Sequence, residues 1–225
     1  LSLRRQRQMC IRDSMYKMIV FDCDGTLLDS SAMIAMIQKG YSSMFPQRKK
    51  QPYAFFIPCY YMSDEENLAY LQIPKSCKRQ FEELCFGKCG DFSSHTHIFE
   101  GIQELLRQLL DDGIALGIAT SRNTTAFLEL QSMFDADIFS AFSSIGTQDV
   151  VKHTKPAPDV LYYIMEQTNL TAQELLFIGD SINDALCAKA AGVDFAWAKW
   201  GVVSEEELPY TYCLYDPQDV YNILR

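Results

Sequence analysis

Short apolar runs that end in polar turns recur along this sequence, and they constrain the fold more than any other feature. The run YKMIVFD, which starts at Tyr16, ends in an Asp-Gly turn, and similar apolar runs cover 114–120, 175–179 and 193–198. Runs that are apolar at nearly every residue are typical of strands buried on both faces of a parallel sheet.

Helical patterns separate these runs. Apolar residues recur at helical spacing over 102–110, and further helices are predicted at about 157–168 and about 182–191. Thr171-x-x-Glu174 is a capping-box pattern, but it predicts only a short turn because a strand follows at once. Alternating strands and helices with short connections predict an α/β fold, a Rossmann-like three-layer core with a parallel sheet between helices.

The alternation stops between Leu28 and about Ile98. Three helical patterns stand in this interval, near 30–45, 64–72 and 75–90. We therefore predict a helical cap domain at 29–97, inserted into a core domain made of 15–28 and 98–225. The aromatic segment PQRKKQPYAFFIPCYYM in its middle favours packing inside the cap, with a substrate-facing surface as the alternative.

Residues 1–14, LSLRRQRQMCIRDS, hold four arginines and no continuous apolar segment, so they do not resemble a secretory signal. They resemble a translated sequencing adaptor, and we expect the natural chain to begin at Met15.

Eight cysteines without framework spacing, in a chain of 225 residues, indicate a reducing cytoplasm.

The charge balance narrows the choice of partners. Twenty Lys and Arg against 29 Asp and Glu give a formal net charge of -9, which disfavours nucleic acid and anionic lipid. The longest apolar stretch is shorter than the roughly 20 residues that a membrane span needs. We expect a cytoplasmic monomer or homodimer that binds neither nucleic acid nor membrane.

Four polar clusters carry the chemistry, and the first is Asp22-Cys23-Asp24-Gly25-Thr26. Residues two apart in an extended chain project to the same side, so the carboxylates of Asp22 and Asp24 are predicted to converge on one point. Gly25 permits the turn beyond them. Asp-Gly turns after strands also occur without any function.

The second and third clusters offer groups that bind a phosphate. In Thr120-Ser121-Arg122, the Thr120 hydroxyl and the following backbone N–H groups can bind phosphate oxygens, although Ser and Thr are also ordinary helix caps. In Lys155-Pro156-Ala157-Pro158-Asp159, Lys155 can neutralise a phosphoryl group, with Lys152 as its nearby competitor.

The fourth cluster, GDSIND, holds Asp180 and Asp184, which lie one turn apart if a helix begins at about 182. Three or four carboxylates at one crevice repel each other unless they share a proton or bind a cation. Hard oxygen ligands indicate Mg²⁺. A lysine and a hydroxyl nearby suggest that the site acts on a phosphoryl group.

The segments DCDGTLLDS, ATSR, KPAPD and GDSINDALCAKAAG resemble, in order and spacing, the four motifs of the haloacid dehalogenase superfamily. The segment AWAKWGVVSEEEL is similar to phosphoglycolate phosphatases within that superfamily. The resemblance implies a phosphatase for a small phosphorylated metabolite, phosphoglycolate-like, with Mg²⁺ as cofactor.

The resemblance also implies a role for each matching residue. Asp22 is the expected nucleophile that forms an aspartyl phosphate, and Asp24 the expected general acid and base. The expected Mg²⁺ ligands are the Asp22 carboxylate, the Asp24 backbone carbonyl, Asp180, and Asp184 directly or through water. The expected phosphate-binding groups are Thr120, the Ser121 backbone and Lys155.

Other readings stay open. Asp24 indicates phosphate chemistry instead of carbon–halogen chemistry, but a sugar-phosphate mutase of the β-phosphoglucomutase type or an inorganic pyrophosphatase shares the four motifs. A receiver-like phospho-accepting module is the non-enzyme alternative, disfavoured by Asp24 and by the inserted segment. Arg122 stands where relatives more often have Lys, which leaves the substrate open.

The set of Cys85, Cys89, His95 and His97 fits no standard zinc spacing, and we interpret it as buried thiols and surface histidines.

Overall fold

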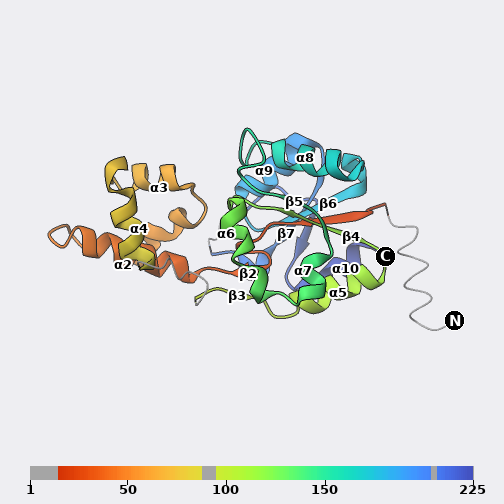
Figure 1. Ribbon diagram of the computed structural model, residues 1–225, viewed down its shortest axis with the longest axis horizontal. Coiled ribbons are helices and arrows are strands. Elements are labelled where there is room, and N and C mark those ends of the chain that lie inside the picture. Colours follow the sequence, from red (N-terminus) through yellow and green to blue (C-terminus); the bar gives the residue numbers. More distant parts are fainter. Residues whose placement is uncertain (1–14, 88–94, 204–206, 225) are drawn as a thin grey trace. The chain divides into compact units, whose positions relative to one another are not determined.

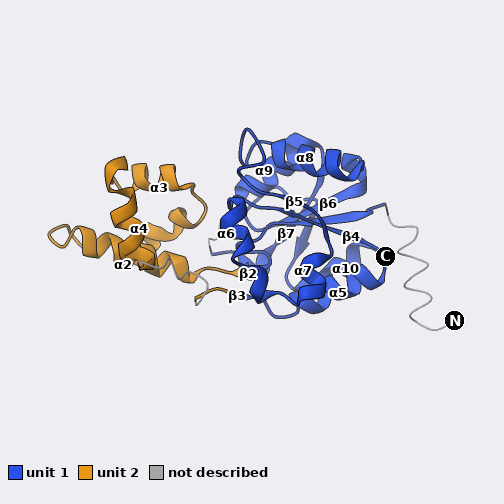
Figure 2. Cartoon of the chain, viewed as in Figure 1, with its two compact units in different colours: residues 1–28, 98–225 blue, residues 29–97 orange. Residues whose placement is uncertain are grey.

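A computed structural model describes residues 15–87, 95–203 and 207–224 (Figure 1). The expected leader, 1–14, and Cys89 lie outside the described residues. The chain forms two compact units, one made of the residues up to Leu28 and from Ile98 onward, the other made of Asp29–His97 (Figure 2).

A six-stranded sheet forms the centre of the first unit, with the strand order β5-β4-β1-β6-β7-β8. The strands are β1 (Met18–Phe21), β4 (Ala115–Ala119), β5 (Phe142–Gly146), β6 (Leu175–Gly179), β7 (Asp194–Ala198) and β8 (Tyr212–Leu214). Every neighbouring pair in this sheet is parallel. Since sheets of this kind are buried on both faces, their strands read as continuous apolar runs.

Successive residues of each strand point to opposite faces of the sheet, and each face has its own core. Ile19 and Phe21 of β1 pack on one face, and Met18 and Val20 of the same strand pack on the other. All four side chains are fully buried. The two cores make the sheet the middle of three layers.

Helices cover both faces of the sheet (Figure 1). The first core includes side chains of α5 (Ile102–Asp111), α7 (Ala136–Ser140) and α10 (Val220–Ile223). The second includes side chains of α8 (Asp159–Thr168) and α9 (Ile182–Ala191). The predicted Rossmann-like three-layer α/β fold is confirmed. Across the described ranges of the chain, no helix combines the length and apolar character that crossing a bilayer requires.

Local sequence signals set several element boundaries. Ser181 begins α9 as its N-cap, accepting a hydrogen bond from the backbone N–H of Asp184 in a capping box. Gly192, at a φ of 71°, ends the same helix in the left-handed conformation that glycine adopts readily. Thr171 and Glu174 form the expected capping box on a short 3₁₀ turn.

The second unit is helical. Its elements are α2 (Ala32–Met44), the 3₁₀ helix η1 (Tyr53–Tyr60), α3 (Asp64–Tyr70), η2 (Lys75–Cys77) and α4 (Lys78–Phe86). Gly40 lets α2 approach α4 closely, because a Cβ at that position would lie 2.3 Å from the Sγ atom of Cys85. In η1, Phe56, Cys59 and Tyr60 are buried, as the packing interpretation of the aromatic segment predicts for these residues.

Candidate active site

Polar residues gather at the carboxyl edge of the sheet because the strands are parallel and in close register. Phe21 of β1 pairs with Ile118 of β4 and with Ile178 of β6. The chain continues from these strands to Asp22, Thr120 and Asp180, which therefore emerge at the same edge.

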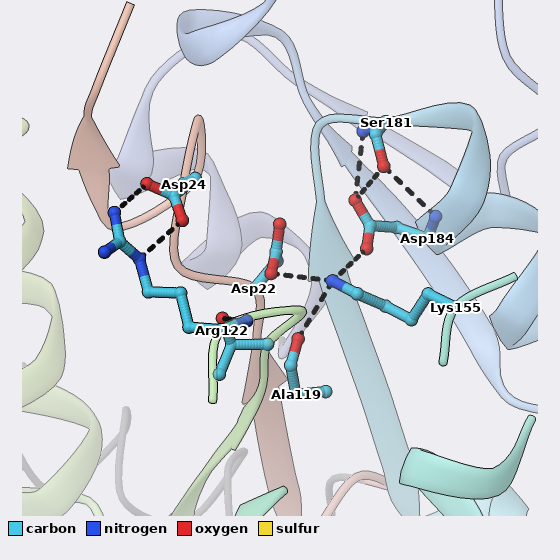
Figure 3. Close-up of polar contacts among 8 residues, drawn as sticks. Asp22, Asp24, Ala119, Arg122, Lys155, Ser181 and Asp184 are labelled. Atoms are coloured by element: carbon cyan, nitrogen blue, oxygen red, sulfur yellow. Dashed lines mark hydrogen bonds and ion pairs between the residues drawn. The ribbon is translucent and has the colours of Figure 1, made fainter. Parts of the chain in front are cut away.

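Lys155 lies at the centre of this group (Figure 3). Its Nζ atom donates to Oδ1 of Asp22 at 2.7 Å, to Oδ1 of Asp184 at 2.7 Å and to the carbonyl of Ala119 at 3.0 Å. These three acceptors match the three N–H donors of an ammonium group. The Lys155 side chain is 4% exposed, so the ion pairs are buried.

Asp184 is held on its other side by the cap of α9. Its Oδ2 atom accepts from the hydroxyl of Ser181 at 2.5 Å and from the Ser181 backbone N–H at 3.1 Å. Asp184 is fully buried. The capping box of Ser181 and Asp184 therefore fixes the orientation of the Asp184 carboxylate.

Three buried carboxylates lie together at the sheet edge. Asp22, Asp180 and Asp184 each offer an oxygen atom within 4.8 Å of the other two. The Oδ2 atom of Asp180 is buried and has no hydrogen-bond partner. Gly25, at a φ of 75°, brings the chain so close that a Cβ there would lie 2.2 Å from that oxygen. The motif glycine therefore leaves room for Asp180.

The surroundings change the protonation of these groups. Burial and the nearby Asp184 raise the pKa of Asp22 to about 7, against the opposing effect of Lys155. Burial and the charges of Asp184 and Asp22 raise the pKa of Asp180 well above its usual range. Burial works to lower the pKa of Lys155, but Asp184 and Asp22 raise it overall, which keeps the ammonium charged. The cluster carries more acid than the lysine can balance.

Asp24 has a different partner from Asp22. Its two carboxylate oxygens accept from Nε and Nη2 of Arg122, each at 2.7 Å, while the Asp22 carboxylate faces Lys155 (Figure 3). The two carboxylates are therefore held by two different cations, and their convergence on one point stays a prediction. Sequence reasoning noted Arg122 only as a departure from its relatives and missed this pairing over 98 residues of chain.

The second cluster forms the turn that carries Arg122. Thr120 is buried, and its Oγ1 atom accepts from the backbone N–H of Arg122 at 3.1 Å. The Thr120 backbone N–H donates to the carbonyl of Gly146 at 2.9 Å, whereas Ser121 is exposed. Phosphate binding by Thr120 and Ser121 stays a prediction.

The other residues considered from the sequence have the following surroundings. Lys152 is exposed, and His153 pairs with Asp159 at 3.1 Å with its side chain 61% exposed. Cys23 is fully buried among core residues, as its position predicts. In the second unit, Cys85 is buried and His97 lies 3.7 Å from Asp29.

A parallel α/β sheet that gathers acids and a lysine with strongly shifted pKa values at its carboxyl edge is typical of an enzyme active site. Residues 19–198 match the haloacid dehalogenase-like hydrolase family, which covers most of the chain. The protein belongs to the haloacid dehalogenase-like hydrolase family. The resemblance that the four motifs predict is confirmed.

Individual relatives agree with this assignment. A phosphoglycolate phosphatase of Photorhabdus laumondii is 30% identical over 181 residues, covering 77% of this chain and 76% of the relative. A protein of Caldanaerobacter subterraneus named as a candidate pyrophosphatase, PpaX, is 26% identical over 217 residues, 92% of each chain. The crystal structure of a candidate phosphoglycolate phosphatase from Lactobacillus plantarum superposes with a TM-score of 0.77 at 26% identity, over 92% of this chain and 99% of the other.

Proposed function

We propose that this protein is a Mg²⁺-dependent phosphatase that hydrolyses a small phosphomonoester, phosphoglycolate-like, through an aspartyl-phosphate intermediate. The observation that carries the proposal is the buried Lys155, which donates both to Asp22 and to Asp184 within a cluster of three acids. One ammonium beside three carboxylates suits a site that holds a cation and a phosphoryl group together.

The residues present fit a magnesium ion. Asp22, Asp180 and Asp184 supply hard oxygen ligands, and the partnerless, buried Oδ2 atom of Asp180 is costly to desolvate unless a ligand compensates it. With the Asp24 backbone carbonyl, these residues are the proposed ligands. A bound Mg²⁺ supplies charge neutralisation, which lowers the repulsion between the nucleophile and an anionic phosphate.

Asp22 is the proposed nucleophile. Its Oδ1 atom accepts from Lys155, so we assign the attack on phosphorus to Oδ2. The bond from Oδ2 to phosphorus forms as the bond from phosphorus to the alcohol oxygen breaks, and the departing alkoxide takes a proton from Asp24. A water then attacks phosphorus and gives a proton to Asp24, while the bond from Oδ2 to phosphorus breaks. This step restores the Asp22 carboxylate and releases inorganic phosphate.

Lys155 and the turn after β4 are the proposed phosphate-binding groups. The ammonium of Lys155 neutralises charge on the oxygens of the transferring group, and the Thr120 hydroxyl with the Ser121 backbone N–H adds hydrogen bonds. The helical unit, 29–97, is the proposed cap that shields the reaction from bulk water.

The experiment is an assay of the purified protein with Mg²⁺, using p-nitrophenyl phosphate and a panel that contains phosphoglycolate and pyrophosphate. We expect Asp22→Asn to lower kcat by about 10³-fold or more, because the covalent route is lost. Asp137→Asn, at an exposed position of α7, is the matched control that retains activity. Full activity of Asp22→Asn, or of the wild type in EDTA, contradicts the mechanism.

A second candidate function is inorganic pyrophosphatase. Its support is the relative named as a candidate pyrophosphatase, which aligns over 92% of this chain. The same four clusters serve either reaction, so the substrate panel decides between them. A kcat/KM for pyrophosphate above that of every phosphomonoester tested favours this second function.

A further inference from the structure

Arg122 and Asp24 form a two-point ion pair beside the proposed nucleophile. Nε of Arg122 donates to one Asp24 oxygen and Nη2 donates to the other, both at 2.7 Å. The two side chains are 16% and 30% exposed, so the pair is only partly shielded from solvent. It therefore differs from the Lys155 pairs, whose members are almost fully buried.

The backbone at Arg122 is fixed, and its side chain is the part that can move. The backbone N–H of Arg122 donates to Thr120, and its carbonyl accepts from the backbone N–H of Gln148 at 2.9 Å. The guanidinium stands at the end of a long, rotatable side chain on this fixed base. Rotation of this side chain would therefore bring the guanidinium to another partner without moving the backbone.

The pair conflicts with the proposed role of Asp24. A general acid must bring a carboxyl oxygen within hydrogen-bond reach of the leaving oxygen. In this structure both Asp24 oxygens accept from the same guanidinium, and the carboxylate is turned toward Arg122 (Figure 3). Turnover thus requires that the pair separates and that the partly buried guanidinium receives another anion, because an unpaired buried charge is costly.

We propose that Arg122 exchanges Asp24 for a second anionic group of the substrate, and that this exchange frees Asp24 for catalysis. The inference rests on the proposed phosphatase function and names its substrate class, phosphomonoesters that also carry a carboxylate or a second phosphate. A guanidinium binds either anion through two parallel hydrogen bonds, the geometry it now makes with Asp24. A monoester with an uncharged tail offers no replacement and leaves the pair closed.

The test compares phosphoglycolate with ethyl phosphate, which lacks the carboxylate. The measured quantity is the kcat/KM for phosphoglycolate divided by the kcat/KM for ethyl phosphate. We expect Arg122→Met to reduce this ratio by about 10- to 100-fold, the range for hydrogen bonds to a charged group. Arg122→Lys retains the charge but loses the two-point geometry, so its ratio falls between those of Arg122→Met and the wild type.

A purely structural role lowers both kcat/KM values by the same factor, and an unchanged ratio in both variants overturns the exchange. Wild-type protein that hydrolyses neither substrate overturns the proposed function and this inference together. An active wild type with an unchanged ratio overturns only the inference.

A measurement that does not depend on the Arg122 variants is a crystal structure of Asp22→Asn with phosphoglycolate bound. We expect the guanidinium on the substrate carboxylate and an Arg122–Asp24 separation beyond about 4 Å, the usual limit of an ion pair. An intact Arg122–Asp24 pair in that complex contradicts the exchange.

Discussion

The two ends of the same sheet carry charge in opposite ways. At the amino end, Lys17 precedes β1 and Glu174 precedes β6, and their side chains pair one to one at 2.5 Å, with exposures of 63% and 24%. At the carboxyl end, the buried acids Asp22, Asp180 and Asp184 lie close together, and the Lys155 ammonium pairs with two of them, Asp22 and Asp184.

The charges at the amino end are compatible with stable folding, whereas those at the carboxyl end oppose folding and are explained by a role in catalysis. An exposed one-to-one pair suits folding, although it contributes little free energy. A buried excess of like charge opposes folding and persists because the rest of the sheet supplies enough stability to hold it. The central strand β1 contributes to that stability, since all four of its residues are apolar and buried.

Matched lysine substitutions at the two ends give the largest expected effect. Lys155→Met leaves the Asp22 and Asp184 carboxylates buried without their cation, so we expect the free energy of unfolding in EDTA to fall by about 3–5 kcal/mol. We expect phosphatase kcat to fall by about 10²- to 10³-fold as well. Lys17→Met, at the exposed pair, is expected to change stability by about 1 kcal/mol or less and to retain activity.

Urea unfolding monitored by circular dichroism, together with steady-state kinetics, measures both variants. Equal destabilisation by the two substitutions contradicts the difference between the two ends of the sheet. It means that the buried cluster depends on its cation no more than the exposed pair does. Lys155→Met with wild-type kcat separately contradicts a role of the ammonium in phosphate binding.

The sequence predicted the parts of the fold that local patterns encode. The strands at β1, β4, β6 and β7 were predicted because each is an apolar run that ends in a polar turn. The edge strand β5 was not, because Phe142–Gly146 alternates buried and less buried residues and contains two serines and a glycine. The other edge strand, β8, spans only three residues, too few for a period.

The sequence likewise predicts one part of the candidate site and not the other. The approach of Asp22 to Asp180 and Lys155 follows from parallel strands with a shared carboxyl edge, which the sequence predicts. The choice of cation by each acid does not follow, because Asp22 pairs with Lys155 over 133 residues and Asp24 pairs with Arg122 over 98. Side-chain directions after the turn decide such pairings, and no local pattern specifies them.

Adding Mg²⁺ is expected to give the next largest difference in stability between the two ends of the sheet. If Mg²⁺ binds the acidic cluster, a concentration of about 100 times its Kd raises the free energy of unfolding by about 2.7 kcal/mol. Asp180→Asn removes one like charge from the cluster, so we expect higher stability in EDTA and loss of the Mg²⁺ increment. Thermal unfolding with EDTA and with Mg²⁺ measures both quantities.

An aspartate at the amino end provides the control. Asp194 begins β7, and its Oδ2 atom accepts from the Tyr16 hydroxyl at 2.5 Å. We expect Asp194→Asn to lower stability by a similar amount in EDTA and in Mg²⁺, because it weakens a structural hydrogen bond without touching the cluster. A Mg²⁺ increment that survives Asp180→Asn, or that Asp194→Asn abolishes, places the ion away from the proposed ligands.

The smallest expected effect is the pH dependence of the exposed pair. The hydrogen bond from Lys17, together with those from Thr171, lowers the pKa of Glu174 from 4.5 to about 2. A carboxyl whose pKa is lower in the folded state stabilises the protein above its ordinary pKa, and this contribution disappears as pH falls through the folded value. We therefore expect Glu174→Gln to melt slightly below the wild type at neutral pH, and we expect this difference to shrink as the pH falls through about 2. Glu166→Gln, an exposed position on α8, controls for the change in net charge. If the difference in melting temperature between Glu174→Gln and the wild type instead widens toward low pH, the expected pH dependence is wrong. The ion pair at this end of the sheet then does not stabilise the fold.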